Sequence, residues 1–147
     1  MSYLLDTSIL TRLINATDTQ HAQATFALQK LVAEGEDLCI TAQNIIEFWT
    51  VATRPTEVNG LGLSTTDASA HVLQFMGAFI FLEDDPAIFQ SWQALVNGAA
   101  VSGKQAHDAR LAAVAFSYGV PNILTFNDRH FLRFVRFGVT PINPGNV

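Results

Sequence analysis

Five acidic or amide side chains in this sequence could together bind a divalent cation. They are Asp6, Glu47, Asp108, Asn127 and Asp128. If three or four carboxylates converged without a partner, they would repel one another, and each would raise its neighbours' affinity for protons. A divalent cation removes that conflict. These residues could therefore form one cation site if the fold brings them together.

The ligand types favour Mg²⁺, or Mn²⁺, over zinc. The candidate ligands are all oxygen atoms, and the single cysteine, Cys39, rules out an internal disulfide framework and argues against a cysteine-rich zinc site. Magnesium normally keeps several waters and takes one or two protein carboxylates, which leaves places for a phosphate oxygen and a nucleophilic water. Such a site could hydrolyse a phosphodiester, because the ion neutralises developing charge and makes a bound water easier to deprotonate.

Each acid also has a purely structural interpretation. Asp108 stands in the first turn of an expected helix, where an acid interacts favourably with the helix dipole and can cap free amides. Asp6 could itself cap the helix that follows it, although the hydroxyls of Thr7 and Ser8 could also fill that role. Glu47 lies in an apolar run, so it either reaches solvent or is held inside by a partner. The sequence leaves these alternatives open.

The elements that must position these residues alternate between strand and helix. Apolar segments and turn signals predict strands at 2–5, 38–40, 79–82, 122–125 and 138–142. Helices are expected from about residue 9 and at 18–33, 42–54 after a Thr41 cap, from Ser64 or Thr65, from Asp85 or Pro86, and at 106–118. This order predicts a single α/β domain over residues 1–147, with a mainly parallel central sheet and helices on both faces.

A parallel sheet gathers ligands beyond the carboxyl ends of its strands. Asp6, Asn127 and Asp128 each follow a predicted strand, and Asp108 could face the same edge. Glu47 falls one turn or so into the helix after another strand. Residues far apart in the sequence could thus line one crevice.

Helical spacing predicts the buried side chains of four helices. On each helix the residues expected to face the core form a stripe. The four stripes are Ala22, Phe26, Leu28, Leu31 and Val32; Ala68, Val72, Leu73 and Met76; Phe89, Trp92, Leu95 and Val96; and Leu111, Ala112, Ala115 and Phe116.

The composition is that of a folded domain, with 49% apolar and 14% charged residues, and no apolar run is long enough to span a bilayer. The start, MSYLLDTS, has no basic region or cleavage pattern, and cytoplasmic localisation fits. A net charge of −5 is awkward for a nucleic-acid partner unless the acids concentrate in one pocket. Arg129, His130, Arg133 and Arg136 could form a basic rim around it or an ordinary solvated face.

The ordered set of motifs resembles the PIN-domain ribonucleases, and closely the VapC-type toxins of toxin–antitoxin pairs. The motifs are Asp6-Thr7-Ser8, Glu47 in NIIEFW, Asp108 in HDARLAA, and Thr125-Phe126-Asn127-Asp128. The resemblance covers nearly the whole chain, including the segment TRPTEVNGLGLS. No single motif is specific, and the resemblance rests on their order.

This resemblance implies a three-layer α/β/α domain that works as a Mg²⁺-dependent endoribonuclease. Asp6 and Asp108 would be the principal metal ligands, Glu47 would complete the site directly or through water, and Thr7 or Ser8 would orient Asp6. The resemblance also implies an RNA substrate, a homodimer, and a protein antitoxin that covers the acidic groove.

The fourth acidic position of the family falls on one of two neighbouring residues. Counting from Thr125 places it on Asn127, and counting back from Phe131 places it on Asp128. We include both, with Asp128 favoured for its charge and Asn127 for polar support.

Two other function classes compete with this interpretation. One is a PIN-like RNA- or protein-binding module that has lost its chemistry, although the intact Asp6, Glu47 and Asp108 argue against it. The other is a small-molecule phosphohydrolase that uses Asp6 as a covalent nucleophile. Such families usually place a second acid two residues later, where this chain has Ser8.

Overall fold

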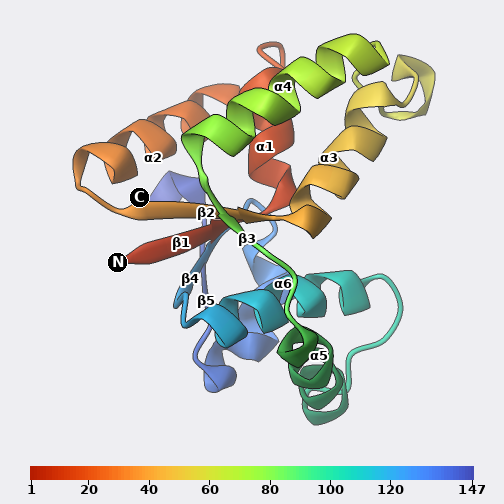
Figure 1. Cartoon of the computed structure of the whole chain (residues 1–147). Coiled ribbons are helices and arrows are strands. Elements are labelled where there is room, and N and C mark those ends of the chain that lie inside the picture. Colours follow the sequence, from red (N-terminus) through yellow and green to blue (C-terminus); the bar gives the residue numbers. More distant parts are fainter.

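Five parallel strands form one sheet in the computed structural model, which describes all 147 residues (Figure 1). Their order across the sheet is β3-β2-β1-β4-β5, and every neighbouring pair is parallel. The strands are β1 (Ser2–Leu5), β2 (Asp37–Thr41), β3 (Ile80–Leu82), β4 (Asn122–Leu124) and β5 (Thr140–Ile142). All five carboxyl ends therefore lie on one edge, as the sequence predicted.

Helices cover both faces of this sheet and complete the predicted three layers. In Figure 1, α1 to α4 lie on one side of the strands, and α5 and α6 lie on the other. The helices are α1 (Thr7–Ile14), α2 (His21–Ala33), α3 (Ala42–Thr53), α4 (Thr65–Ala78), α5 (Pro86–Gly98) and α6 (Gln105–Tyr118). Three 3₁₀ segments are η1 (Thr56–Val58), η2 (Asp128–Phe137) and η3 (Pro144–Asn146). None of the helices combines the length and apolar character that crossing a membrane would need.

The core consists of two apolar clusters, one on each face of the sheet. Successive side chains of a strand point to opposite faces. Accordingly, Leu4 packs in the cluster beneath α5 and α6, whereas Leu5 packs with α1 to α4. On β4, which pairs with the central strand β1, Ile123 and Leu124 divide in the same way. The middle strands are therefore buried on both sides, and they hold the sheet edge that follows them in a fixed position.

Most predicted boundaries agree with the structure, and the small differences have local causes. Helix α2 begins at His21 rather than Asp18, because the Asp18 carboxylate accepts a hydrogen bond from the Gln20 amide at 2.8 Å and forms a turn there. Strand β3 begins at Ile80, since Phe79 still donates its amide to the Phe75 carbonyl at the end of α4.

The predicted stripes were partly wrong, because several large apolar side chains lie on outer helix faces. Small residues take their place: the buried positions of α2 include Ala24 and Ala27. Alanine is small, so it lets a helix approach the sheet closely. A prediction based on large apolar residues does not identify such buried alanines. The stripe residues that are exposed are Ala22, Phe26, Val32, Leu73, Met76, Phe89 and Phe116.

Helix α3 begins directly at the end of β2 through a reciprocal cap. The Thr41 hydroxyl accepts a hydrogen bond from the Asn44 amide at 3.3 Å, and the Asn44 side-chain oxygen accepts one from the Thr41 amide at 2.9 Å. Both residues are buried. The predicted Thr41 cap is confirmed, and it fixes the start of the helix that carries Glu47.

We predict that Thr41→Ala lowers the free energy of unfolding by about 1–2 kcal/mol, because it removes an N-cap hydroxyl from a buried helix start. Urea unfolding followed by circular dichroism measures the change. Ser64→Ala is the matched control, since Ser64 caps α4 from an exposed position through a single bond of 3.1 Å. An equal or smaller loss for Thr41→Ala would contradict the structural role given to this cap.

Candidate active site

Asp6 lies at the centre of the carboxyl edge and is only 5% exposed. It is the N-cap residue of α1, and one of its carboxylate oxygens accepts a hydrogen bond from the Thr7 amide at 2.9 Å. The other oxygen accepts hydrogen bonds from the hydroxyls of Ser8 at 2.8 Å and Thr125 at 2.7 Å. Asp6 itself is therefore the cap, and Ser8 orients its carboxylate together with Thr125 from the end of β4.

Glu47 is partly buried on α3 and is held by two neighbours. Its Oε1 accepts a hydrogen bond from Gln43 Nε2 at 2.7 Å, and its Oε2 accepts one from Thr7 Oγ1 at 3.3 Å. Burial raises the pKa of Glu47, and the charge of Asp6 raises it further, whereas the bonds from Gln43 and Thr7 act in the opposite direction. Glu47 is thus held inside by partners, which resolves the alternative that the sequence left open.

Asp108 lies in the first turn of α6 and belongs to the same electrostatic site. Burial, followed by the negative charge of Asp6, raises its pKa to about 6. His130 lowers this value, with its Nδ1 at 3.3 Å from the Asp108 carboxylate, and Glu47 raises it. Since Asp6 and Glu47 both act on Asp108, the fold brings together three acids that are far apart in the sequence.

Asn127 and Asp128 lie where η2 begins, and they make different contacts. Asp128 accepts a hydrogen bond from the Asn143 side chain at 3.0 Å. The Asn127 side chain is exposed, while its backbone amide donates to the Thr125 hydroxyl at 2.9 Å. Neither side chain contributes to the shifted pKa of Asp108 or Glu47. Asn127 therefore supports the hydroxyl that holds Asp6, and Asp128 is engaged with the C-terminal segment.

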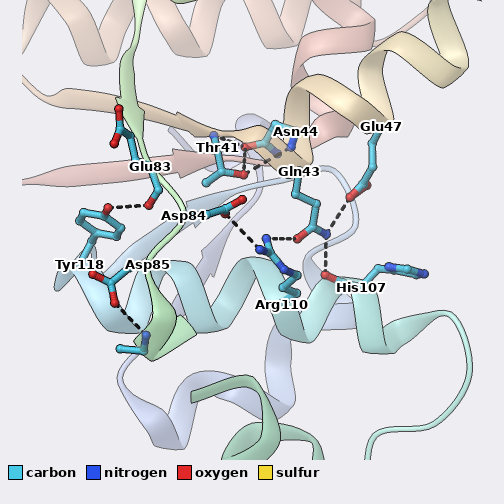
Figure 2. A network of polar contacts seen from close by, with 11 residues as sticks. Thr41, Gln43, Asn44, Glu47, Glu83, Asp84, Asp85, His107, Arg110 and Tyr118 are labelled. Atoms are coloured by element: carbon cyan, nitrogen blue, oxygen red, sulfur yellow. Dashed lines mark hydrogen bonds and ion pairs between the residues drawn. The ribbon is translucent and has the colours of Figure 1, made fainter. Parts of the chain in front are cut away.

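A second group of polar residues joins this site, and motif analysis did not single it out. Gln43 bonds to Glu47, to the backbone carbonyl of His107 and to Arg110, and Arg110 forms an ion pair with Asp84 (Figure 2). The imidazole of His107 is not part of this network. The only available signal was the position of Gln43 one helical turn before Glu47.

The donor set at this edge fits a hard cation in its chemistry. Asp6, Glu47 and Asp108 offer only oxygen atoms, and burial, together with the charges of the neighbouring acids, raises the pKa of Glu47 and Asp108. No three His, Cys, Asp or Glu side chains are gathered closely enough to form a ready-made metal cage. Magnesium commonly uses one or two protein carboxylates and completes its shell with water, so a cage is not required.

A protein-family model, described as the PIN domain, matches residues 3–136 of this chain. The chain belongs to the PIN-domain family. The match extends from β1 through nearly all of η2, so it includes every site residue predicted from the sequence.

Solved structures share the fold of this PIN domain at low sequence identity. The VapBC2 structure from Rickettsia felis, bound to a DNA fragment from its promoter, matches with a TM-score of 0.71 and 16% identity, covering 97% of this chain and 98% of that chain. The VapBC-1 structure from nontypeable Haemophilus influenzae has a TM-score of 0.69 and 16% identity, covering 99% of each chain.

A third structure is that of VapC20 from Mycobacterium tuberculosis, described as a sarcin-ricin loop cleaving toxin. It matches with a TM-score of 0.58 and 21% identity, covering 82% of this chain and 86% of that chain. A search of curated proteins found no match.

We predict that Asp108 stabilises the metal-free PIN domain less and less as the pH rises from about 4 to 7. The pKa of Asp108 is raised from 3.8 to about 6, so this carboxyl's contribution is fully present below pH 3.8 and is lost as the pH rises through about 6. At pH 7.5 in EDTA, Asp108→Asn should therefore increase the free energy of unfolding by about 1–2 kcal/mol, after allowing for solvent screening of a partly exposed group.

Urea unfolding between pH 4 and pH 8 measures this effect. Asp67→Asn is the control, since Asp67 also stands in the first turn of a helix but is exposed. If Asp108→Asn had the same pH dependence as the unmodified protein, the electrostatic coupling described for this site would be wrong.

Proposed function

We propose that this PIN-domain protein is a Mg²⁺-dependent endoribonuclease and the toxin of a type II toxin–antitoxin pair. One observation carries the proposal: Asp6, Glu47 and Asp108 reach a single site at the carboxyl edge, and their charges interact there. Such a concentration of negative charge is costly unless a cation offsets it. We assign Asp6 and Asp108 as the principal ligands, with Glu47 completing the site directly or through water.

Bound Mg²⁺, or Mn²⁺ in its place, would offset charge that develops on a phosphodiester and make a water easier to deprotonate. The residues of the chain keep the carboxylates in position for that purpose. Ser8 and Thr125 donate to one oxygen of Asp6, and Thr7 donates to Glu47. Asp128 is the further catalytic acid of the proposal, and Asn127 gives polar support.

RNA is the proposed substrate, and η2 supplies positive charge near the acids. This segment contacts Asp108 through His130, and it also carries Arg129 and Arg133, both of which are exposed. Basic side chains next to an acidic site can bind the phosphate backbone while the net charge of the chain stays negative. The fold shared with VapC20, a sarcin-ricin loop cleaving toxin, supports RNA as the substrate class.

A cognate antitoxin and a homodimer complete the proposal. The Rickettsia felis relative is a VapBC2 assembly bound to promoter DNA, and a further similar structure is described as a toxin–antitoxin complex from Klebsiella pneumoniae. This chain leaves large apolar side chains exposed on the outer faces of α3 and α4, among them Ile46, Leu73 and Met76. Apolar surface of this kind supports association with another protein chain.

We predict that the purified protein cleaves labelled single-stranded RNA when Mg²⁺ or Mn²⁺ is present and not in EDTA. Asp6→Asn keeps the size of the side chain and an oxygen that can cap α1, but it removes the charge. The rate should fall by about 100-fold or more, because metal ions supply several kcal/mol of charge stabilisation and about 1.4 kcal/mol corresponds to a factor of ten. Gel electrophoresis of the RNA products measures the rate.

Asp67→Asn is the control, with the same chemical change at an exposed acid that is not among the charges acting on Glu47 or Asp108. RNA binding without metal-dependent cleavage would instead identify a PIN module that has lost its chemistry. Turnover of a small phosphate ester with phosphorylated Asp6 would identify a phosphohydrolase. Either result would overturn the ribonuclease proposal.

A further inference from the structure

A neutral amide separates a positive side chain from one acid of the site. Gln43 lies in the first turn of α3, and its Nε2 donates to Glu47 Oε1 at 2.7 Å and to the His107 carbonyl at 2.8 Å. Its Oε1 accepts a hydrogen bond from Arg110 Nη1 at 3.2 Å (Figure 2). One side chain thus links the helix that carries Glu47 to the helix that carries Asp108.

Its partners permit only one orientation of this amide. An amide has an acceptor oxygen at one end and two N–H donors at the other. The carboxylate of Glu47 and the carbonyl of His107 can only accept, whereas the guanidinium of Arg110 can only donate. A reversed amide would place acceptors against acceptors and donors against a donor. The contacts of Gln43 are therefore specific for a neutral amide.

Arg110 would be a strong competitor for Glu47 if this amide were absent. Both side chains line one cavity of about 280 Å³, together with Gln43 and Asp84. A guanidinium matches a carboxylate in two parallel hydrogen bonds, and such a pair would occupy oxygens that a cation needs. The present partner of Arg110 is Asp84 at 3.0 Å, but that carboxylate is 53% exposed, and exposed ion pairs are weak.

We propose that Gln43 is a positioning residue for the metal site. It fixes the carboxylate of Glu47 relative to α6, and it keeps that carboxylate out of a direct ion pair with Arg110. The inference rests on the proposed function in one respect, namely that Glu47 binds the cation directly or through water. It adds a residue that touches neither metal nor RNA and acts through Glu47.

The test is a titration with Mn²⁺, followed by the electron paramagnetic resonance signal of the free ion. Gln43→Ala should weaken Mn²⁺ binding by about tenfold or more, in the range found when partners of metal ligands are removed. Gln43→Ala combined with Arg110→Met should recover most of the lost affinity, because the competing guanidinium is gone. Arg110→Met alone should raise Mn²⁺ affinity by a smaller factor than it does in the Gln43→Ala background, and this non-additivity would not follow from a purely structural role of Gln43.

Gln43→Met is a second variant that keeps the length of the side chain but not its hydrogen bonds. It should weaken Mn²⁺ binding less than Gln43→Ala, because it still fills the space between Arg110 and Glu47. Gln29→Ala is the matched control, since Gln29 is an exposed glutamine on α2. Circular dichroism confirms that each variant is folded.

Two results would overturn the inference: unchanged Mn²⁺ affinity in Gln43→Ala, or a double variant that binds no better than Gln43→Ala. If the unmodified protein bound no Mn²⁺, the proposed function would fail instead. A crystal structure of Gln43→Ala would then decide the positioning role by itself. Arg110 on the Glu47 carboxylate would support the role, and an unmoved Glu47 would contradict it.

Discussion

Electrostatic repulsion among partly buried carboxylates is the constraint on which this structure depends. Asp6 caps α1, Glu47 lies in the second turn of α3 and Asp108 lies in the first turn of α6, and the parallel sheet brings all three to one edge. Water would screen these charges, but burial reduces the contact of the carboxylates with water. Burial and the charge of Asp6 therefore raise the pKa of Asp108 to about 6. The fold tolerates this arrangement because two buried apolar clusters fix the strands from both sides.

Hydroxyl and amide donors, more than opposite charges, hold these acids in place. Asp6 accepts hydrogen bonds from Ser8 and Thr125, and Glu47 accepts them from Thr7 and Gln43. Neutral donors orient a carboxylate without cancelling its charge, so its attraction for a cation remains. Asp108 is the exception, because its neighbour His130 carries a positive charge when the imidazole is protonated.

The sequence predicted the path of the chain well, because local signals determine it. The apolar run before Asp6 and the Thr41 cap of α3 each depend on a few neighbouring residues. The parallel sheet then follows from the alternation of strands and helices, and it brings the acids to one edge.

Other features could not be read from spacing, because they depend on contacts between distant segments. Large apolar residues such as Leu73 were placed inside, although they lie on outer faces that no other part of the chain covers. The bonds of Gln43 to Arg110 and His107 join positions more than sixty residues apart. The spacing of residues within one helix or strand does not predict contacts between two such distant segments. The sequence likewise gave no sign that Asp128 would bond to Asn143.

The bond between Thr125 and Asp6 has a consequence for the order of events during synthesis. It spans 119 residues, and it depends on the pairing of β1 with β4 in the observed register. A slip of one residue would turn the Thr125 side chain to the opposite face. Because Asp6 leaves the ribosome 119 residues before Thr125, this acidic edge cannot be completed until Thr125 has also emerged. A growing polypeptide therefore remains without the finished site until the segment that forms β4 is available to pair with β1.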